Sequence, residues 1–379
     1  MKQPLRILSV IDIPWNSGLA AYAFEQALAL RGGGHSVVFA CPEGSAAMEF
    51  AARENFKHFP ISGRKEYHRL PPTLLRLRAA VRKEKLDAIC AHTGRAQTMC
   101  FLLGLPLLRV KADAKKPSGG FFASGSLTFS SVKKTIAASA YIEKLYREAG
   151  LDSSRVTVIR QGIKLPPAAP LQSSVPFKIG MMGRLDPVKG HACFLKAAAE
   201  LLRSGVKAEF HIAGYEAGVK YPDLLKIAEE LDITASVVFH GKVEYPFKFM
   251  AACDIGVIAS LGSEAVSRAA LEWLASGRPL ISTPAGSLPE YVNPEWLVSP
   301  GDHAALAVKI AGLLADPARI KILGEENRTR AARDFSSEAF AAATCAVFEE
   351  VVNGETAKVS GGCSPAKNLR GGGLEPPSR

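Results

Sequence analysis

Short apolar strands alternate with longer helical patterns along almost the whole chain, and this alternation limits the fold more than any other feature. In the first half, Ile7–Ile13, Ser36–Ala40, Leu86–Ala91 and Lys134–Ser139 are predicted strands, and about Ala20 to Leu30 is a predicted helix. Apolar strands that alternate with helices are typical of βαβ units, in which helices cover both faces of a parallel sheet. The sequence therefore predicts an α/β protein.

The pattern is interrupted once and then restarts. Lys164–Pro176 is rich in Pro, Ala and Ser, and a second series begins with the strand Phe177–Met182. Its prolines oppose both helices and central strands, so this stretch is the best linker. We therefore predict two Rossmann-like, doubly wound domains, over residues 1–165 and 166–352, that face each other across a cleft. We leave open whether the last helix, about 338–352, crosses back. Residues 353–379 are predicted to be disordered because they are rich in Gly, Pro and Ser.

Composition excludes several classes of protein. The chain has 379 residues, 47% of them apolar, which is enough for two hydrophobic cores. Its seven cysteines are scattered, without a CxxC pair or zinc-ligand spacing, and are expected to be reduced thiols in a cytoplasm. No apolar run reaches the roughly 18 residues of a membrane span, and the first residues are expected to be a buried strand rather than a signal peptide.

The positive charge is concentrated in the first half. Residues 1–165 hold 25 Lys and Arg against 12 Asp and Glu, a net charge of +13, whereas residues 166–379 hold 22 against 24, a net charge of −2. Arg64–Lys85 combines eight cations with interleaved leucines, and Arg109, Lys111, Lys115 and Lys116 follow. This mixture suits an anionic membrane surface, or else a solvated amphipathic helix. Nucleic acid is disfavoured because no binding motif or aromatic stacking platform accompanies the charge.

The first motif with chemical content directly follows the strand Phe177–Met182. It reads GRLDPVKG, from Gly183 to Gly190, and places Arg184 and Lys189 between a strand end and a helix start. Free N–H groups at a helix start and a guanidinium both favour phosphate oxygens. The motif is neither a P-loop nor GxGxxG, and a solvated basic turn is the alternative interpretation.

The second motif is a pair of carboxylates, Glu264 and Glu272, with seven residues between them. Glu264 is expected in the loop after the strand Ile255–Ala259, and Glu272 within a helix over about Ser267–Ala275. They therefore cannot form an i,i+4 pair. Two acids that flank a buried helix start suit the recognition of sugar and ribose hydroxyls, although Glu272 could equally be an ordinary helix acid.

Together the two motifs resemble the retaining GT-B glycosyltransferases of the family 4 type. The resemblance extends over about Leu5–Val352 and includes HIAG at His211–Gly214, VVFHGKV at Val237–Val243 and STPAGSLPEYV at Ser282–Val292. In the first half, the Gly18 loop, GGHSV, DAICAH and IRQGI match less sharply. Two departures, Gln161–Lys164 in place of Asn-Gly-Val-Asp and Ala265–Arg268 in place of a glycine-rich stretch, leave the donor sugar open. Arg268 is either an extra cation near the phosphates or a surface residue.

The resemblance implies a nucleotide-sugar donor, UDP-sugar first, and neither a cofactor nor a metal. Gly183, Arg184 and Lys189 would bind its diphosphate, with backbone N–H groups near Ser267. Glu272 would accept hydrogen bonds from the ribose, and Glu264 would face the sugar. Two side-chain cations can stabilise the departing diphosphate.

In the first domain, the resemblance implies that Gly18 lets the backbone approach the donor phosphates, and that His92 lies near the donor sugar. A packed strand-end histidine is the alternative for His92. With Arg184, Lys189 and Glu264, His92 completes the predicted catalytic set. No carboxylate is expected to act as a nucleophile. The leaving phosphate itself would help to deprotonate the acceptor, and the protein would contribute positioning and charge.

The function that the resemblance implies is transfer of a hexosyl group from a nucleotide-sugar to a glycan or lipid-linked acceptor. The expected setting is lipopolysaccharide-core or other cell-envelope synthesis in the cytoplasm, with peripheral contact to the inner face of the plasma membrane. Val110–Phe122 is a candidate part of the acceptor site. A UDP-sugar 2-epimerase of the same fold and a non-catalytic nucleotide-sugar-binding protein are the alternatives. A Rossmann dehydrogenase is disfavoured because the chain lacks GxGxxG.

Overall fold

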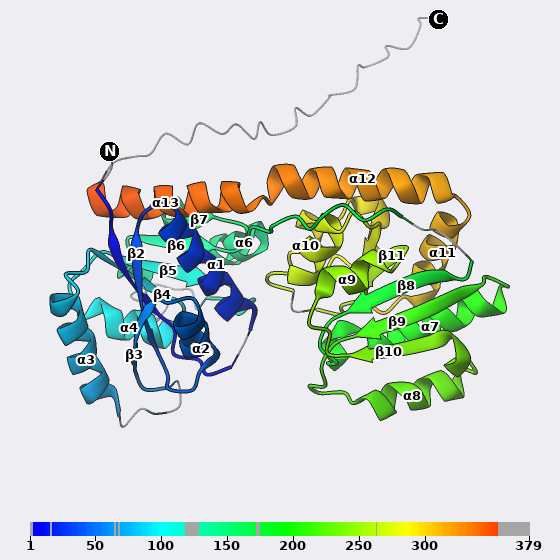
Figure 1. The fold of residues 1–379 in the computed structure, drawn as a ribbon, viewed down its shortest axis with the longest axis horizontal. Coiled ribbons are helices and arrows are strands. Elements are labelled where there is room, and N and C mark those ends of the chain that lie inside the picture. Colours follow the sequence, from blue (N-terminus) through cyan, green and yellow to red (C-terminus); the bar gives the residue numbers. More distant parts are fainter. Residues whose placement is uncertain are drawn as a thin grey trace, which may run out of the picture.

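The molecule consists of two lobes, each built on a parallel sheet (Figure 1). The structure is a computed structural model, which describes residues 3–15, 17–63, 66, 69–117, 129–171, 175–262 and 264–354. Each sheet is covered by helices, and buried apolar residues lie on both of its faces. The prediction of an α/β protein with two Rossmann-like halves is confirmed.

The first lobe contains a seven-stranded sheet in the order β3-β2-β1-β4-β5-β6-β7. Its strands are β1 (Arg6–Val10), β2 (Ser36–Cys41), β3 (Lys57–Pro60), β4 (Ala88–Ala91), β5 (Leu107–Lys111), β6 (Lys134–Ala137) and β7 (Val156–Val158). The helices between them are α1 (Gly18–Gly32), α2 (Ala46–Arg53), α3 (Leu70–Lys83), α4 (Gly94–Phe101) and α6 (Ala140–Glu148).

The second lobe contains a five-stranded sheet in the order β10-β9-β8-β11-β12. Its strands are β8 (Phe177–Met182), β9 (Ala208–Ala213), β10 (Val237–Gly241), β11 (Ile255–Ile258) and β12 (Leu280–Ser282). Its helices are α7 (His191–Arg203), α8 (Tyr221–Glu230), α9 (Pro246–Ala251), α10 (Arg268–Ala275), α11 (His303–Leu314) and α12 (Pro317–Asp334), and α13 (Ser337–Asn353) follows.

Both sheets reverse their winding direction at a central strand. In the first, β2 and β4 flank β1, and in the second, β9 and β11 flank β8. Loops that leave neighbouring strands at such a switch point diverge to opposite faces of the sheet and open a crevice, where ligands of this architecture bind. The topology therefore selects the loops after β1, β4, β8 and β11.

The central strands are apolar because both of their faces are buried. In β1, Ile7 packs into one core and Leu8 into another, as the two-residue period of a strand requires. Four helices that follow strands of this sheet are capped by a hydroxyl side chain at the N-terminus, from Ser17, Ser45, Thr93 and Ser139. These caps turn the chain sharply and bring helix starts to the carboxyl edge of the sheet.

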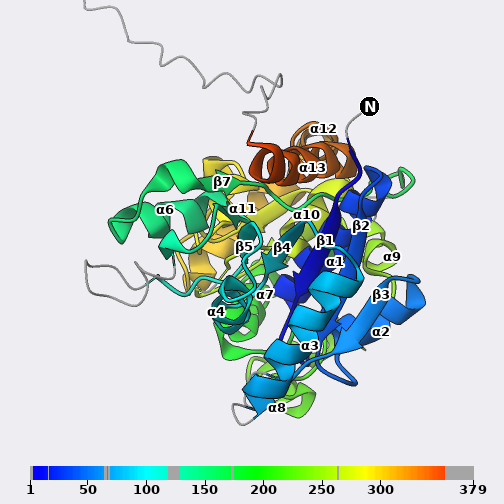
Figure 2. The ribbon, with the colours of Figure 1, turned by 90° about the vertical axis from the view of Figure 1, so that its left-hand side faces the viewer.

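The chain crosses between the lobes twice, at neighbouring positions. Ile163 leaves the first lobe and pairs with Ser336, where the chain returns as α13. The α13 helix packs along α1 at the top of the first lobe (Figures 1 and 2), and the Phe340 ring meets Tyr22 edge-on at 5.4 Å. The linker itself is held by a buried arginine side chain, since Arg278 donates to the Ala169 and Pro170 carbonyls. The last helix thus completes the core of the first lobe.

Element boundaries differ slightly from those expected. The first strand ends at Val10 rather than Ile13, and the first helix extends from Gly18 to Gly32. The predicted disordered tail lies outside the described residues, apart from Asn353 and Gly354. Among the helices that the structure describes, none combines the length and the apolarity needed to cross a bilayer.

We predict that Phe348→Ala on α13 destabilises the first lobe by about 3–5 kcal/mol, because Phe348 is fully buried in that lobe's core. Val308→Ala on α11 is the control, since Val308 is 72% exposed and its truncation should change stability by no more than about 0.5 kcal/mol. Urea unfolding followed by circular dichroism measures both. Equal midpoints for the two variants would show that α13 is not part of the first core.

Candidate active site in the cleft between the lobes

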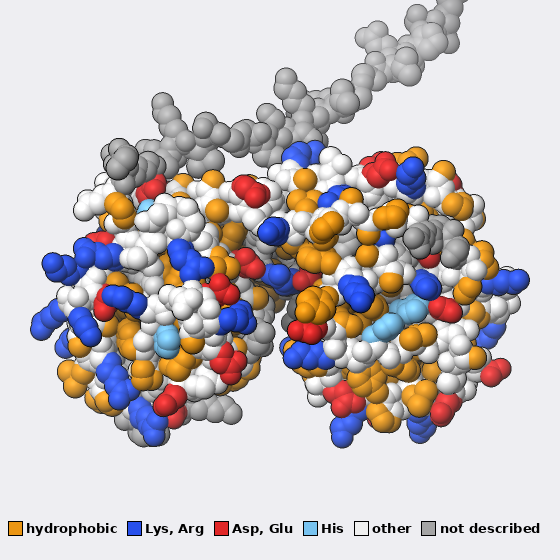
Figure 3. Space-filling view, viewed as in Figure 1, with side chains coloured by type: hydrophobic (Ala, Val, Ile, Leu, Met, Phe, Trp, Pro, Cys, Tyr) orange, Lys and Arg blue, Asp and Glu red, His pale blue; other side chains and the backbone are white. Residues whose placement is uncertain are grey.

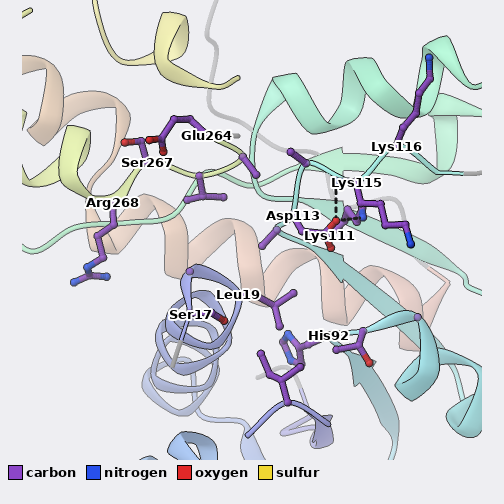
Figure 4. A pocket seen from close by; sticks show the side chains of 18 of the residues that line it. Ser17, Leu19, His92, Lys111, Asp113, Lys115, Lys116, Glu264, Ser267 and Arg268 are labelled. Atoms are coloured by element: carbon purple, nitrogen blue, oxygen red, sulfur yellow. Dashed lines mark hydrogen bonds and ion pairs between the residues drawn. The ribbon is translucent and has the colours of Figure 1, made fainter. Parts of the chain in front are cut away.

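A cavity of about 940 Å³ lies between the lobes, at the carboxyl ends of the central strands. The loops selected by the topology all contribute to its lining, with Gly18 after β1, His92 after β4, Arg184 after β8 and Glu264 after β11. Figure 3 shows the hollow between the two lobes, and Figure 4 shows labelled residues of both lobes around it. The structure therefore brings these predicted residues together from four separate loops.

The loop after β8 presents two cations to this cavity. Arg184 lies 3.1 Å from Asp186 and its side chain is 47% exposed, so its guanidinium remains accessible. Asp186 also caps the short turn Pro187–Lys189 by accepting from the backbone N–H of Val188. The turn ends at Gly190 in a left-handed conformation, where an added Cβ would lie 2.0 Å from the Ala259 carbonyl oxygen. The loop is therefore fixed by tight packing against Ala259, the residue that follows β11.

The second cation, Lys189, is paired with Glu264 across the cavity edge. The Lys189 Nζ atom lies 2.6 Å from Glu264 Oε1, and the Ser260 hydroxyl donates to the same oxygen at 2.5 Å. The Glu264 backbone is also fixed, because its carbonyl accepts from Ser287 N and lies 2.2 Å from where a Cβ of Gly286 would be. This buried carboxylate is thus positioned by two contacts to one of its oxygens and by its fixed backbone.

The α10 helix starts at the cavity with Ser267 and Arg268 on the lining. The Ser267 side chain makes no capping hydrogen bond, so the first backbone N–H groups of the helix keep their capacity to donate. Glu272, one turn further along, is almost fully buried and is not on the cavity lining. Burial raises its pKa, and the neighbouring Arg268 opposes that rise.

Arg268 pairs with one carboxylate of its own lobe and lies near another of the first lobe. Its Nε donates to Glu272 at 3.0 Å, and its Nη1 lies 3.7 Å from Glu25 on α1 of the first lobe. Arg268 lies on the cavity lining with the other cations, as its interpretation as an extra cation near the phosphates requires, and it also pairs with the acid expected to bind ribose. A ligand that reaches Glu272 must share that carboxylate with Arg268.

The first lobe contributes His92 and Gly18. His92 is fully buried and its Nε2 lies 3.0 Å from the Ser9 hydroxyl, while its Nδ1 has no partner among the described residues. Burial, and secondly the charge of Arg109, lower the pKa of His92 to about 3, so the ring is neutral at physiological pH. A Cβ added at Gly18 would meet no atom within 4 Å. The fold itself therefore does not require glycine there.

Two residues that the sequence reasoning did not single out connect the lobes beside the donor loop. The Ser139 hydroxyl donates to the Ala265 carbonyl at 2.8 Å, directly after Glu264. Glu290 accepts from the backbone N–H groups of Ala140 and Tyr141 at the start of α6, and from Arg160. Glu290 lies within the STPAGSLPEYV segment, so the resemblance pointed to its surroundings. Its partners could not be found from the sequence, because they lie 130 to 150 positions away.

The site as a whole offers cations, helix N–H groups and a buried acid, Glu264, within one cavity. Such a set can bind phosphate oxygens beside hydroxyl groups. Within the described ranges, no group of three or more His, Cys, Asp or Glu side chains is arranged to hold a metal ion.

Two family models match the chain in consecutive segments. The model described as "Glycosyltransferase Family 4" matches residues 16–165, and the one described as "Glycosyl transferases group 1" matches residues 176–316. Between them they extend over most of both lobes.

Curated relatives match at moderate identity. The chain is 37% identical to an MMP alpha-(1->4)-mannosyltransferase of Mycolicibacterium hassiacum over 107 residues, 27% of this chain and 26% of that protein. It is 24% identical to a D-inositol 3-phosphate glycosyltransferase of Segniliparus rotundus over 307 residues, 76% of this chain and 66% of the relative. The matches thus span less than two thirds of the length of either relative.

Solved structures share the fold at low sequence identity. A glycosyltransferase from Rickettsia africae superposes with a TM-score of 0.81 at 18% identity, with 93% of this chain and all of that chain covered. Anabaena Alr3699/HepE in complex with UDP-glucose gives a TM-score of 0.74 at 18% identity over 91% of this chain and all of the other. With the fold, the loop motifs and both family models in agreement, the chain belongs to the GT-B glycosyltransferases of the family 4 type.

Proposed function

We propose that this protein transfers a hexosyl group from a nucleotide-sugar, with a UDP-sugar as the first candidate, to a glycan or lipid-linked acceptor of the cell envelope. One observation carries the proposal: residues from both switch points, Arg184 and Glu264 on one side and Gly18 and His92 on the other, line a single cavity. A donor bound between two such loops has its phosphates and its sugar in reach of different lobes.

On the second-lobe side, Gly183, Arg184 and Lys189 bind the diphosphate together with the free N–H groups at the start of α10. The geometry supports this because both cations and Ser267 line the cavity. Glu272 lies behind this lining, and the donor must reach past it for the ribose hydroxyls to donate to the carboxylate oxygen that Arg268 does not use. Glu264 faces the sugar. Because Lys189 touches Glu264, one contact fixes the phosphate-binding cation relative to the sugar-binding acid.

The reaction that we propose retains the configuration of the sugar and uses no metal. The bond between the anomeric carbon and the phosphate oxygen breaks, and the acceptor oxygen bonds to that carbon on the same face. The acceptor proton passes to the leaving phosphate. Arg184 and Lys189 stabilise the negative charge that develops there. Stabilisation of developing charge by fixed groups is usually the largest single contribution to enzymatic rate enhancement. His92, neutral and buried beside the first-lobe wall, helps to position the sugar.

The names of similar proteins support this class of reaction and leave the substrates to experiment. They include a structure with UDP-glucose bound, a lipopolysaccharide outer core galactosyltransferase, WaaB, with a TM-score of 0.70 at 13% identity, and enzymes named for inositol phosphate and mannosyl transfer. We propose that the reaction belongs to lipopolysaccharide-core synthesis and takes place in the cytoplasm.

We further propose that the first lobe docks on the inner face of the plasma membrane through α3. Leu75 is 66% exposed on this helix, beside the exposed cations Arg76, Arg78 and Arg82. In Figure 2 the helix lies on the side of the first lobe that faces away from the second. Docking there leaves the cleft free to take an acceptor from the membrane. The cations Arg64 and Lys65 of the same basic segment lie outside the described residues.

The donor is tested by thermal denaturation of the purified chain with UDP-, GDP- and ADP-sugars, followed by product analysis. We expect at least one to raise the melting temperature, because a ligand of the native state stabilises it. Turnover should then require an acceptor. Product from the nucleotide-sugar alone would indicate an epimerase, and binding without any turnover would indicate a non-catalytic sensor. No stabilisation by any donor would contradict the proposal.

Arg184→Ala should reduce turnover by at least about 100-fold, which corresponds to about 3 kcal/mol of lost transition-state stabilisation. Because Arg184 is half exposed, the melting temperature should hardly change. Lys189→Ala and Glu272→Ala should cause similar losses of turnover. Lys196→Ala, an exposed lysine on α7, is the matched control and should keep full activity. Normal turnover in a folded Arg184→Ala variant would exclude the assigned role.

Membrane docking predicts that the protein sediments with phosphatidylglycerol vesicles. The variant Leu75→Ser with Arg78→Gln and Arg82→Gln should bind at least about tenfold more weakly, since each cation near such a surface contributes about 1 kcal/mol. Lys226→Gln with Lys321→Gln removes two exposed cations of the second lobe and is the charge-matched control. If both variants bound vesicles equally well, α3 would not be the docking surface.

A further inference from the structure

The first-lobe wall of the cavity carries more positive charge than the donor needs. Its lining includes Arg109, Lys111, Lys115 and Lys116, and Asp113 is the one acid of this lobe on the described lining. Figure 4 shows these lysines across the cavity from Glu264 and Ser267, which belong to the proposed donor site. These first-lobe cations therefore face the donor-site cations Arg184 and Lys189 across the cavity. They belong to the lobe that would bind the acceptor.

Two of these cations are buried in the wall. Arg109 and Lys111 are 6% and 7% exposed, and they lie two residues apart on β5, so their side chains project from the same face of the sheet. Burial lowers the pKa of both side chains. Lys111 pairs with Asp113, whereas Arg109 donates only to the Ala91 carbonyl at 3.2 Å and meets no acid within 4.0 Å in the described part of the chain. A buried cation without an acid is costly unless an anion compensates it.

Uncharged groups beside Arg109 also have unused hydrogen-bonding capacity. Thr135 is the register partner of Arg109 on the neighbouring strand β6, and its buried hydroxyl has no partner among the described residues. The buried Nδ1 atom of His92 likewise has no hydrogen-bond partner among the described residues. All of these side chains line the one cavity. The wall thus combines two buried cations with a free hydroxyl, a set that matches a phosphate group in charge and in hydrogen-bonding demand.

We infer that the acceptor carries a phosphate group, and that Arg109, Lys111 and Thr135 bind this group on the first-lobe wall of the cavity. The inference rests on the proposed function, because it names the acceptor of that reaction. The donor diphosphate does not explain these residues, since Arg184 and Lys189 serve it from the opposite lobe. Lys115 and Lys116, which are exposed beside them, draw the anion toward the wall.

The test uses the full chain with UDP at saturating concentration, so that free phosphate cannot bind at Arg184 and Lys189. Glucose 6-phosphate and inorganic phosphate are the soluble probes, glucose is the uncharged control, and a polyprenyl phosphate in phosphatidylcholine vesicles is the lipid probe. Titration calorimetry should show binding of the phosphate probes and none of glucose. Binding of the soluble or of the lipid probe identifies the source of the phosphate, and binding of neither overturns the inference.

The variants Lys111→Met and Arg109→Gln should weaken phosphate binding at least about tenfold, while Arg109→Lys should recover part of it. Lys133→Met, an exposed lysine of the same lobe that lies off this cavity, should bind as the unchanged protein does. UDP affinity is measured on each variant and should remain normal. Unchanged phosphate affinity in Lys111→Met and Arg109→Gln would overturn the inference, whereas failure of the unchanged protein to bind any of UDP, GDP and ADP would instead contradict the proposed function.

Discussion

Everything proposed for the cleft depends on a few hydrogen bonds that join the lobes behind it. The Glu290 carboxylate accepts from two backbone N–H groups at the start of α6, at 2.7 and 3.0 Å, and the Ser139 hydroxyl holds the Ala265 carbonyl. A carboxylate at a helix N-terminus is favoured both by the free N–H groups and by the helix dipole. Because Ala265 directly follows Glu264, the first lobe fixes the loop of the second that would hold the donor sugar.

On the second-lobe side of the site, the charged groups are arranged in pairs rather than singly. Arg184 lies by Asp186, Lys189 by Glu264 and Arg268 by Glu272. Each pairing offsets part of the cost of placing a charge in a partly buried cavity, and it also fixes the direction in which the charge points. Such preorganised charges act on a reaction without needing to reorient, which is where much of the catalytic advantage of an enzyme lies.

Local sequence patterns were sufficient for the fold and for the loops that end at the cleft. Central parallel strands are buried on both faces, so they appear as uninterrupted apolar runs, and the strand Phe177–Met182 was predicted with its observed bounds. Contacts between residues that are far apart in the sequence could not be predicted from these local patterns. Nothing near Arg268 in the sequence indicates that Glu25 faces it, and a charged residue such as Arg109 gives no local sign that its strand is central and buried. The roles assigned to the residues of the site, including Arg184, Lys189 and Glu264 as well as Glu272 and His92, remain predictions.

The return of α13 to the first lobe has a consequence for how this chain is made. Phe348 and its neighbours on that helix belong to the core built around β1, more than 300 residues earlier. During synthesis on the ribosome, the first lobe therefore cannot complete its core until the whole second lobe has been translated. An exchange of lobes between related enzymes, by recombination or by design, would need to carry this helix with the first lobe rather than with the second.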